Sequence, residues 1–179
     1  VDDCRHAVKW VYENIHRHGG DPDRIFVGGH SAGGHLGSLV TLQHNPIKGL
    51  ALPDDVIKGC FSVSGIFDVA DTPEDRRDAF LNSPEEAREA SPLSHVAGNN
   101  VPFLLEIGEH DFPNLKAQHP VMVEALRQQP GRVEAIERNG VNHFQISLDN
   151  GDVCGVWATK VRQWMADLPN SIPQPSGKE

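Results

Sequence analysis

Apolar residues recur along the chain with two different spacings, and the two kinds of segment alternate. Between residues 3 and 18 the apolar positions follow the three- to four-residue period of a helix: Cys4, Val8, Val11 and Ile15. The pair Gly19-Gly20 predicts the end of that helix. Further helices are predicted over residues 32–44, 115–129 and 153–168. The last of them carries a heavy apolar stripe: Val156, Trp157, Val161, Trp164 and Leu168.

Four short runs rich in β-formers and bounded by turn residues predict strands, at residues 24–29, 56–65, 101–108 and 132–138. The first is expected to be a short buried strand. Strands joined by helices indicate βαβ crossovers, and therefore a mostly parallel sheet with helices on both faces. The predicted fold class is α/β.

The segment between the second and third strands, residues 68–100, is too long for a plain crossover. Thr72 followed by Pro73 predicts the start of one short helix there, and Ser83 followed by Pro84 predicts a second. The segment is a candidate cap over a site. Residues 1–168 are expected to form one catalytic domain, and residues 169–179 a disordered tail.

Composition narrows the class of protein. Of the 179 residues 38% are hydrophobic and 23% charged, which predicts a soluble globular domain. The formal net charge is −9 and no block of Lys or Arg is present, which argues against nucleic acid or an anionic membrane as the main partner. No apolar stretch approaches the roughly 20 residues of a membrane helix, and the opening VDDCRHAV does not resemble a signal peptide.

The three cysteines, Cys4, Cys60 and Cys154, show no CxxC spacing. They are interpreted as reduced, mostly buried thiols of a cytoplasmic protein, with a disulfide or a metal site as the alternatives. No set of His, Cys or acidic residues has zinc spacing, so no metal or cofactor is expected.

The string Gly29-His30-Ser31-Ala32-Gly33 matches the G-x-S-x-G nucleophile elbow, with a strand before it and a helix after it. Such a turn exposes the serine hydroxyl, and it places the next backbone N–H groups at a helix N-terminus, where they stabilise an oxyanion. The positions two residues either side of the serine are expected to be small in order to avoid clashes. The alternative is a glycine-rich helix start used for packing or phosphate binding, but the GxGxxG and P-loop patterns are absent.

A nucleophilic serine needs a base and a group that orients the base. Asp111 follows the third predicted strand, and His143 lies in a predicted loop after the fourth, so both are expected at the same sheet edge as Ser31. Other residues of suitable type remain as alternatives: Asp68 and Glu109 for the acid, and His95, His110 and His119 for the base. His30 and His35 are interpreted as local packing or hydrogen-bonding residues.

These residues resemble a known group. GGHSAGGHL, SGIFDV, the string Ala90-Ser91-Pro92, GEHD and NHF are similar to the α/β-hydrolase esterase branch that includes kynurenine formamidases and small carboxylesterases, over about residues 1–168. The resemblance implies a cofactor-free hydrolysis of short acyl or formyl groups. In it Ser31 attacks the carbonyl, His143 transfers the proton, Asp111 holds the imidazole and the Ala32 N–H is one oxyanion donor.

The sequence departs from that branch in one respect. An HGG-type loop after an early strand supplies a second oxyanion donor in the family. Here His18-Gly19-Gly20 follows a predicted helix and is interpreted as its C-cap. The four strands correspond to the later half of an eight-stranded fold, so the sheet should end in an exposed edge at residues 24–29. The chain is interpreted as a fragment that is weakly active or inactive alone, because losing an oxyanion donor costs roughly 10²–10³ in rate.

The leading functional hypothesis is a serine hydrolase that cleaves small carboxylic esters through an acyl-enzyme. An arylformamidase acting on N-formylkynurenine-type amides is the first alternative, and a catalytically silent interaction module is the second. The expected partner is a small-molecule ester or formamide, and a homo-oligomer is left open.

Overall fold

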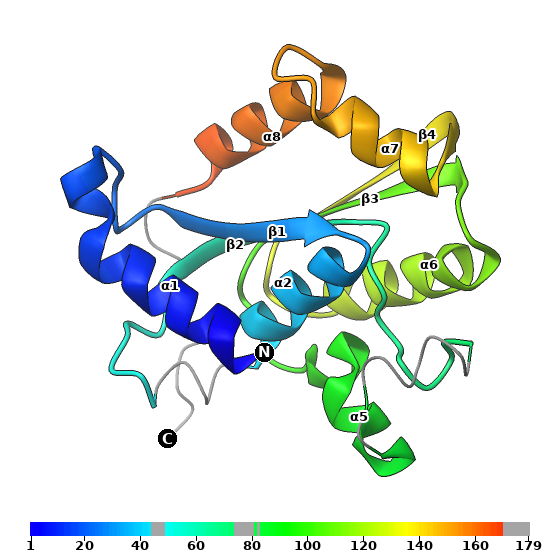
Figure 1. Ribbon diagram of the computed structural model, residues 1–179, viewed down its shortest axis with the longest axis horizontal. Coiled ribbons are helices and arrows are strands. Elements are labelled where there is room, and N and C mark those ends of the chain that lie inside the picture. Colours follow the sequence, from blue (N-terminus) through cyan, green and yellow to red (C-terminus); the bar gives the residue numbers. More distant parts are fainter. Residues whose placement is uncertain (44–48, 74–80, 82, 170–179) are drawn as a thin grey trace.

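A computed structural model describes residues 1–43, 49–73, 81 and 83–169. Its centre is a parallel sheet of four strands whose spatial order equals their order in the chain (Figure 1). The strands are β1 (Ile25–His30), β2 (Ile57–Val63), β3 (Phe103–His110) and β4 (Val133–Asn142). The predicted α/β class and parallel sheet are confirmed.

Helices cover both faces of the sheet. One face carries α1 (Asp2–Asn14), α2 (Ala32–Leu42) and α6 (Pro113–Arg127), and the other carries α7 (His143–Asn150) and α8 (Val156–Asp167) (Figure 1). A 3-10 turn, η1 (Ile15–His18), closes α1, and Gly19 caps it in the left-handed region at φ +80°. The interpretation of His18-Gly19-Gly20 as a helix C-cap is therefore confirmed.

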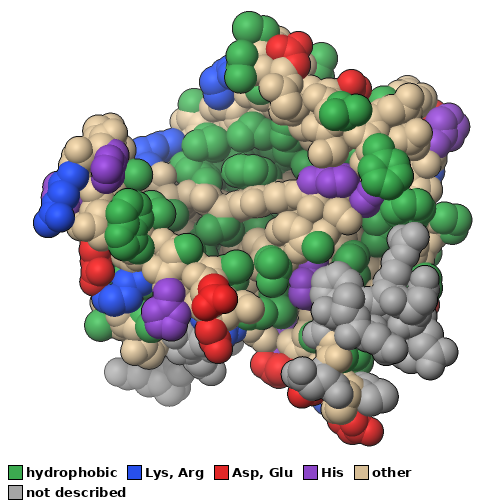
Figure 2. Space-filling model, in the orientation of Figure 1, with side chains coloured by type: hydrophobic (Ala, Val, Ile, Leu, Met, Phe, Trp, Pro, Cys, Tyr) green, Lys and Arg blue, Asp and Glu red, His purple; other side chains and the backbone are tan. Residues whose placement is uncertain are grey.

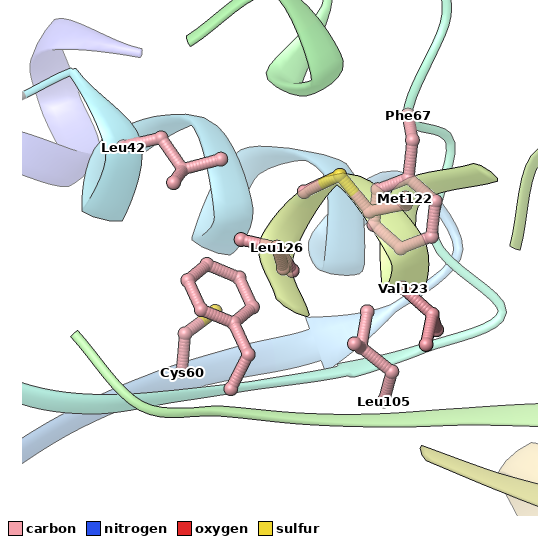
Figure 3. Packing of buried hydrophobic residues seen from close by; sticks show 8 residues of the cluster. Leu42, Cys60, Phe67, Leu105, Met122, Val123 and Leu126 are labelled. Carbon is pink, nitrogen blue, oxygen red and sulfur yellow. The ribbon is translucent and has the colours of Figure 1, made fainter. Parts of the chain in front are cut away.

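The core lies on both sides of the two central strands. Cys60, Phe103, Leu104 and Leu105 are fully buried, and burying each large apolar side chain contributes roughly 1.5–3 kcal/mol. Figure 3 shows the α6 side of this core, where the strand side chains meet the helix and Phe67. Desolvation raises the pKa of the Cys60 thiol to about 12, so this thiol stays protonated and packs as an apolar group.

β1 forms one edge of the sheet, as expected, but it is not a buried strand. Only Ile25 at its start is buried, because the outer side of β1 has no strand partner among the described residues. A cavity of about 420 Å³ runs along it between α1 and α2, lined mainly by apolar side chains and glycines. Figure 2 shows hydrophobic side chains gathered on both sides of the β1 backbone.

Three other expectations were wrong in detail. The predicted loop before the last helix does not form, because β4 continues to Asn142 and His143 begins α7. Val156, placed in the apolar stripe of the last helix together with the buried Trp157 and Trp164, is itself 76% exposed at the first residue of α8. The thiols are all free, but only Cys60 is buried and Cys154 is exposed.

The segment between β2 and β3 is described in part. The first predicted helix, after Thr72, falls mostly outside the described residues. The second begins at Pro84 as the 3-10 turn η2 (Pro84–Glu86), continues as α5 (Ala87–Ala90), and is followed by η3 (Pro92–His95). The predicted tail, from residue 170 on, also lies outside the described residues. In the part of the chain that the structure describes, no helix is long and apolar enough to cross a bilayer.

Candidate active site

Ser31 lies at the turn between β1 and α2. Its backbone has φ +56° and ψ −118°, a conformation that costs a non-glycine residue about 1–3 kcal/mol. The surrounding structure holds it there: the Ser31 N–H donates to the Val63 carbonyl at 2.9 Å, and the Ser31 carbonyl accepts from the His35 N–H at 3.0 Å. The strain is therefore maintained by the sheet and by the first turn of α2.

Of the two glycines that lie two residues before and after Ser31, only the one before it is required by the packing. A Cβ on Gly29 would lie 2.6 Å from the carbonyl carbon of Gly33, because the strand and the helix backbones touch there. A Cβ on Gly33 itself would meet nothing within 4 Å, whereas one on Gly34 would lie 2.6 Å from Ser62 Oγ. The expectation that both positions flanking Ser31 must be small is wrong for Gly33. The crowded helix position is Gly34.

Ser31 follows β1, Asp111 follows β3 and His143 follows β4. The structure brings these three residues together at one edge of the sheet. His143 Nε2 lies 3.0 Å from Ser31 Oγ, and His143 Nδ1 lies 2.8 Å from Asp111 Oδ1. Both the imidazole and the carboxylate are buried. The geometry allows the serine hydroxyl to give its proton to Nε2 while the carboxylate holds the other ring nitrogen.

Two further contacts fix the carboxylate of Asp111. The Ser64 hydroxyl donates to Oδ2 at 2.5 Å, and the Phe112 N–H donates to Oδ1 at 2.7 Å. Burial raises the pKa of this carboxyl, but the hydrogen bonds from His143, Ser64 and Phe112 together outweigh it and leave the pKa below its ordinary value. Asp111 is therefore ionised at neutral pH.

His143 is the first residue of α7, and a capping box sets that position. The Asn142 side chain accepts from the Phe144 and Gln145 N–H groups, both at 3.0 Å, while the Gln145 side chain accepts from the Asn142 N–H at 3.0 Å. Three backbone N–H donors at the helix start are satisfied in this way. The capping box therefore fixes the backbone that carries the imidazole.

Aromatic rings enclose the imidazole of His143. The ring centroids of His30 and Phe112 lie 4.4 and 4.6 Å from it, and that of Phe144 lies 5.4 Å from it. His30 Nε2 also donates to the His143 carbonyl at 2.9 Å. Burial, and next the proximity of His143, lower the pKa of His30, so that this second imidazole is neutral at pH 7.

Both alternative acids have other partners. Asp68 Oδ1 accepts from the Ala70 N–H at 2.9 Å, and Glu109 Oε2 accepts from the Gly140 N–H at 2.7 Å. Among the histidines, the Nε2 atoms of His35 and His95 contact backbone carbonyls at 2.7 and 2.9 Å. His119 is buried on α6, and His110 is exposed at the end of β3.

Sequence reasoning missed Ser64, which entered it only as the first residue of the string SGIFDV. The residue is fully buried and has a positive φ of +50°, which aims its hydroxyl at Asp111. Its position directly after a buried strand, at the carboxyl edge of the sheet, was the available signal.

Ala32 is the first residue of α2. Because the first intrahelical bond of α2 runs from the His35 N–H, the Ala32 N–H has no partner within the helix. It therefore lies next to Ser31 at the positive end of the helix dipole. Across the described ranges, no three His, Cys, Asp or Glu side chains gather as a metal site requires.

Comparison with known proteins gives relatives that are named esterases. Esterase LipQ of Mycobacterium tuberculosis (strain ATCC 25618 / H37Rv) is 31% identical over an alignment of 142 residues, with 71% of this chain and 34% of that protein covered. Esterase LipC of the same strain is 30% identical over an alignment of 161 residues, with 80% of this chain and 38% of that protein covered. The chain thus spans about a third of the length of these relatives.

Solved structures agree on the fold. The metagenomic carboxylesterase EstE1 has a TM-score of 0.72 and 24% identity, covering 93% of this chain and 63% of that one. A truncated carbohydrate esterase from gut microbiota has a TM-score of 0.77 and 18% identity, covering 92% and 66%. The family model described as BD-FAE matches residues 1–126, and the chain therefore belongs to this family of α/β-hydrolase esterases.

Proposed function

We propose that Ser31, His143 and Asp111 form the catalytic triad of a serine esterase that cleaves small carboxylic esters. His143 Nε2 accepts the hydroxyl proton as Ser31 Oγ attacks the ester carbonyl, and the Ala32 N–H stabilises the oxyanion. The tetrahedral intermediate then expels the alcohol, which takes its proton from His143. A water molecule, deprotonated by the same imidazole, hydrolyses the acyl-enzyme and releases the acid.

The observation that carries the proposal is the continuous hydrogen-bonded chain from Ser31 Oγ through His143 to Asp111, with distances of 3.0 and 2.8 Å. The nucleophile lies at a strained strand–helix turn, and a lowered pKa keeps the acid charged. Each of these features belongs to acyl transfer by an activated serine.

The names of the relatives support the ester substrate. LipQ and LipC are named esterases, and EstE1 is a carboxylesterase. No feature of the site favours a formamide over an ester, and the relatives give the formamidase alternative no support. The cytoplasmic location predicted from the cysteines stays a prediction, as does the silent-module alternative.

The test is hydrolysis of p-nitrophenyl acetate and of N-formylkynurenine by the wild type, Ser31→Ala and Ser94→Ala. Ser94 is an exposed serine on η3, so its variant is a control for loss of a hydroxyl. We expect ester turnover by the wild type and Ser94→Ala, and none above background by Ser31→Ala. Equal turnover by all three proteins would refute the role of Ser31.

A further inference from the structure

A charged side chain lies inside the sheet close to the proposed triad. Glu106 occupies the middle of β3 and is 1% exposed, within a run of six buried residues. Because side chains alternate along a strand, Glu106 faces the same side as Leu104, which packs with Ile146 of α7 and Trp164 of α8. A carboxylate at such a position is costly unless every oxygen is paired.

Both oxygens of Glu106 are paired, and the pairing leads to the end of α7. Oε1 accepts from Arg138 Nη1 at 3.1 Å, and Oε2 accepts from Asn150 Nδ2 at 2.7 Å. Arg138, on the neighbouring strand β4, also donates to Asp149 Oδ2 at 3.0 Å. We call these four residues the α7 clasp, because they join two sheet strands to the last two residues of α7.

The other end of the same helix carries the imidazole of His143. α7 has eight residues, a length of about 12 Å, and a helix this short is not stable alone. Its direction therefore depends on tertiary contacts. Besides the contacts of His143 with Asp111 and His30, they include the buried Ile146 near the middle of the helix and the clasp at its C-terminal end, while the capping box fixes the helix start locally. Losing the last contact would allow the helix to pivot.

Stability alone does not account for the clasp. Replacing a buried ion pair by apolar residues of similar volume is often neutral or stabilising, and the surroundings of Glu106 on this face are apolar. Burial raises the pKa of Glu106 above its ordinary value, and the contacts with Asn150 and Arg138 offset this only in part. Directional hydrogen bonds provide what an apolar contact lacks, a fixed orientation for the helix end.

We propose that Glu106 is a positioning residue: through Arg138 and Asn150 it holds α7 so that His143 Nε2 stays within hydrogen-bond distance of Ser31 Oγ. The inference rests on the proposed function, because it assigns the clasp a purpose in the same reaction. The main chain of Glu106 serves the same site, since its carbonyl accepts from the Ser64 N–H at 2.7 Å.

The experiment compares Glu106→Leu and Glu106→Gln with the control Glu134→Gln. Glu134 lies opposite Leu104 on β4, and its carboxylate pairs with Lys160 of α8, a helix that carries no triad residue. For each protein three quantities are measured: the melting temperature, kcat and KM for p-nitrophenyl acetate, and the low-field NMR signal of the His143 Nδ1–H proton.

We expect Glu106→Leu to fold with a lower melting temperature, because Arg138 and Asn150 lose their acceptor. Measured well below that temperature, its kcat should fall roughly 10- to 100-fold at constant KM, and the low-field signal should broaden or be lost. Glu106→Gln keeps an acceptor for Asn150 and should lie between Glu106→Leu and the wild type. Glu134→Gln should match the wild type in kcat and in the NMR signal. Should Glu106→Leu not fold, Glu106→Gln and Asn150→Ala provide the same comparison.

Folded Glu106 variants with wild-type kcat and an unchanged NMR signal would overturn the proposal. So would a loss of activity that only matches the unfolded fraction, because that result indicates a purely structural role. If the wild type shows no turnover, the proposed function fails, but the NMR signal still tests the clasp. A signal that is present in the wild type and lost in Glu106→Leu supports the positioning role. A signal that is the same in both proteins refutes it.

Discussion

At the scale of single residues, the Ser64 hydroxyl completes the surroundings of Asp111. Ser64→Ala removes a hydrogen bond to a buried charge, a contact worth about 1.5–3 kcal/mol, so we expect kcat to fall about tenfold or more. The lost contact also raises the pKa of Asp111 toward its ordinary value. A carboxyl with a lowered folded-state pKa stabilises the fold above its unfolded pKa and loses that contribution as pH falls. Acid unfolding of Ser64→Ala should therefore begin at higher pH.

The matched control for Ser64 is Ser38→Ala. Ser38 is equally buried, and its hydroxyl donates to the Gly34 carbonyl within α2. Kinetics and pH-dependent unfolding measured side by side should show a loss of stability alone in Ser38→Ala. An equal fall in kcat in both variants would mean that the Ser64 contact has no special effect on the site.

Two adjacent glycines test how the elbow is packed. Gly34→Ala places a methyl group 2.6 Å from Ser62 Oγ and 3.1 Å from both the Gly29 carbonyl oxygen and the Gly65 Cα, so unfolding experiments should show a loss of about 1–3 kcal/mol. Gly33→Ala meets open space inside a helix, where alanine is favoured over glycine by up to about 1 kcal/mol. Denaturant titration of the two variants should give opposite signs. A stabilising Gly34→Ala and a destabilising Gly33→Ala would show that Gly34 is not the crowded position of the elbow.

At the scale of elements, α7 connects a local sequence motif to the site. Asn142→Ala removes the capping box and should lower the free energy of unfolding by about 0.5–2 kcal/mol. Because His143 is the next residue, kcat measured well below the melting temperature should fall as well. Phe144→Ala is an informative comparison, since it leaves the cap intact. A folded Asn142→Ala protein with wild-type kcat would show that the cap does not position the imidazole.

The elements also show what sequence can and cannot predict. The strands and the main helices follow from the alternation of two hydrophobic periods, and Ser31, Asp111 and His143 follow from the elbow and the chain order. The residues around His143, after the fourth predicted strand, are predicted to form a loop. In the structure, pairing of β4 with β3 extends as far as His110 opposite Asn142, and the Asn142–Gln145 box then starts a helix. Contacts such as Ser64–Asp111 and Glu106–Asn150 depend on strand register and helix packing, which no local pattern encodes.

At the scale of the whole molecule, we expect a buried histidine to contribute to the loss of stability in acid. His119 on α6 is 8% exposed, and burial lowers its pKa to about 4, although Glu137 and Asp111 act in the opposite direction. A histidine with a lowered folded-state pKa contributes its full stability above the unfolded value of about 6.5 and loses it as pH falls toward 4. The loss over this range is on the order of 3 kcal/mol.

His119→Gln should flatten the pH dependence of stability between about pH 6.5 and 4, since glutamine does not titrate. Exposed His110→Gln is the control and should keep the wild-type slope. Urea unfolding at several pH values measures both. Identical slopes in the wild type and His119→Gln would show that His119 does not control this transition.

The most direct test of Ser31 as the nucleophile is to locate a covalent adduct. The folded protein is treated with a fluorophosphonate probe, and the labelled peptide is sequenced by mass spectrometry. We predict a single modification on Ser31 that is lost in Ser31→Ala and strongly slowed in His143→Ala, because the imidazole 3.0 Å from Ser31 Oγ is its base. Labelling at another serine, or labelling of Ser31 at the same rate without His143, would contradict the account.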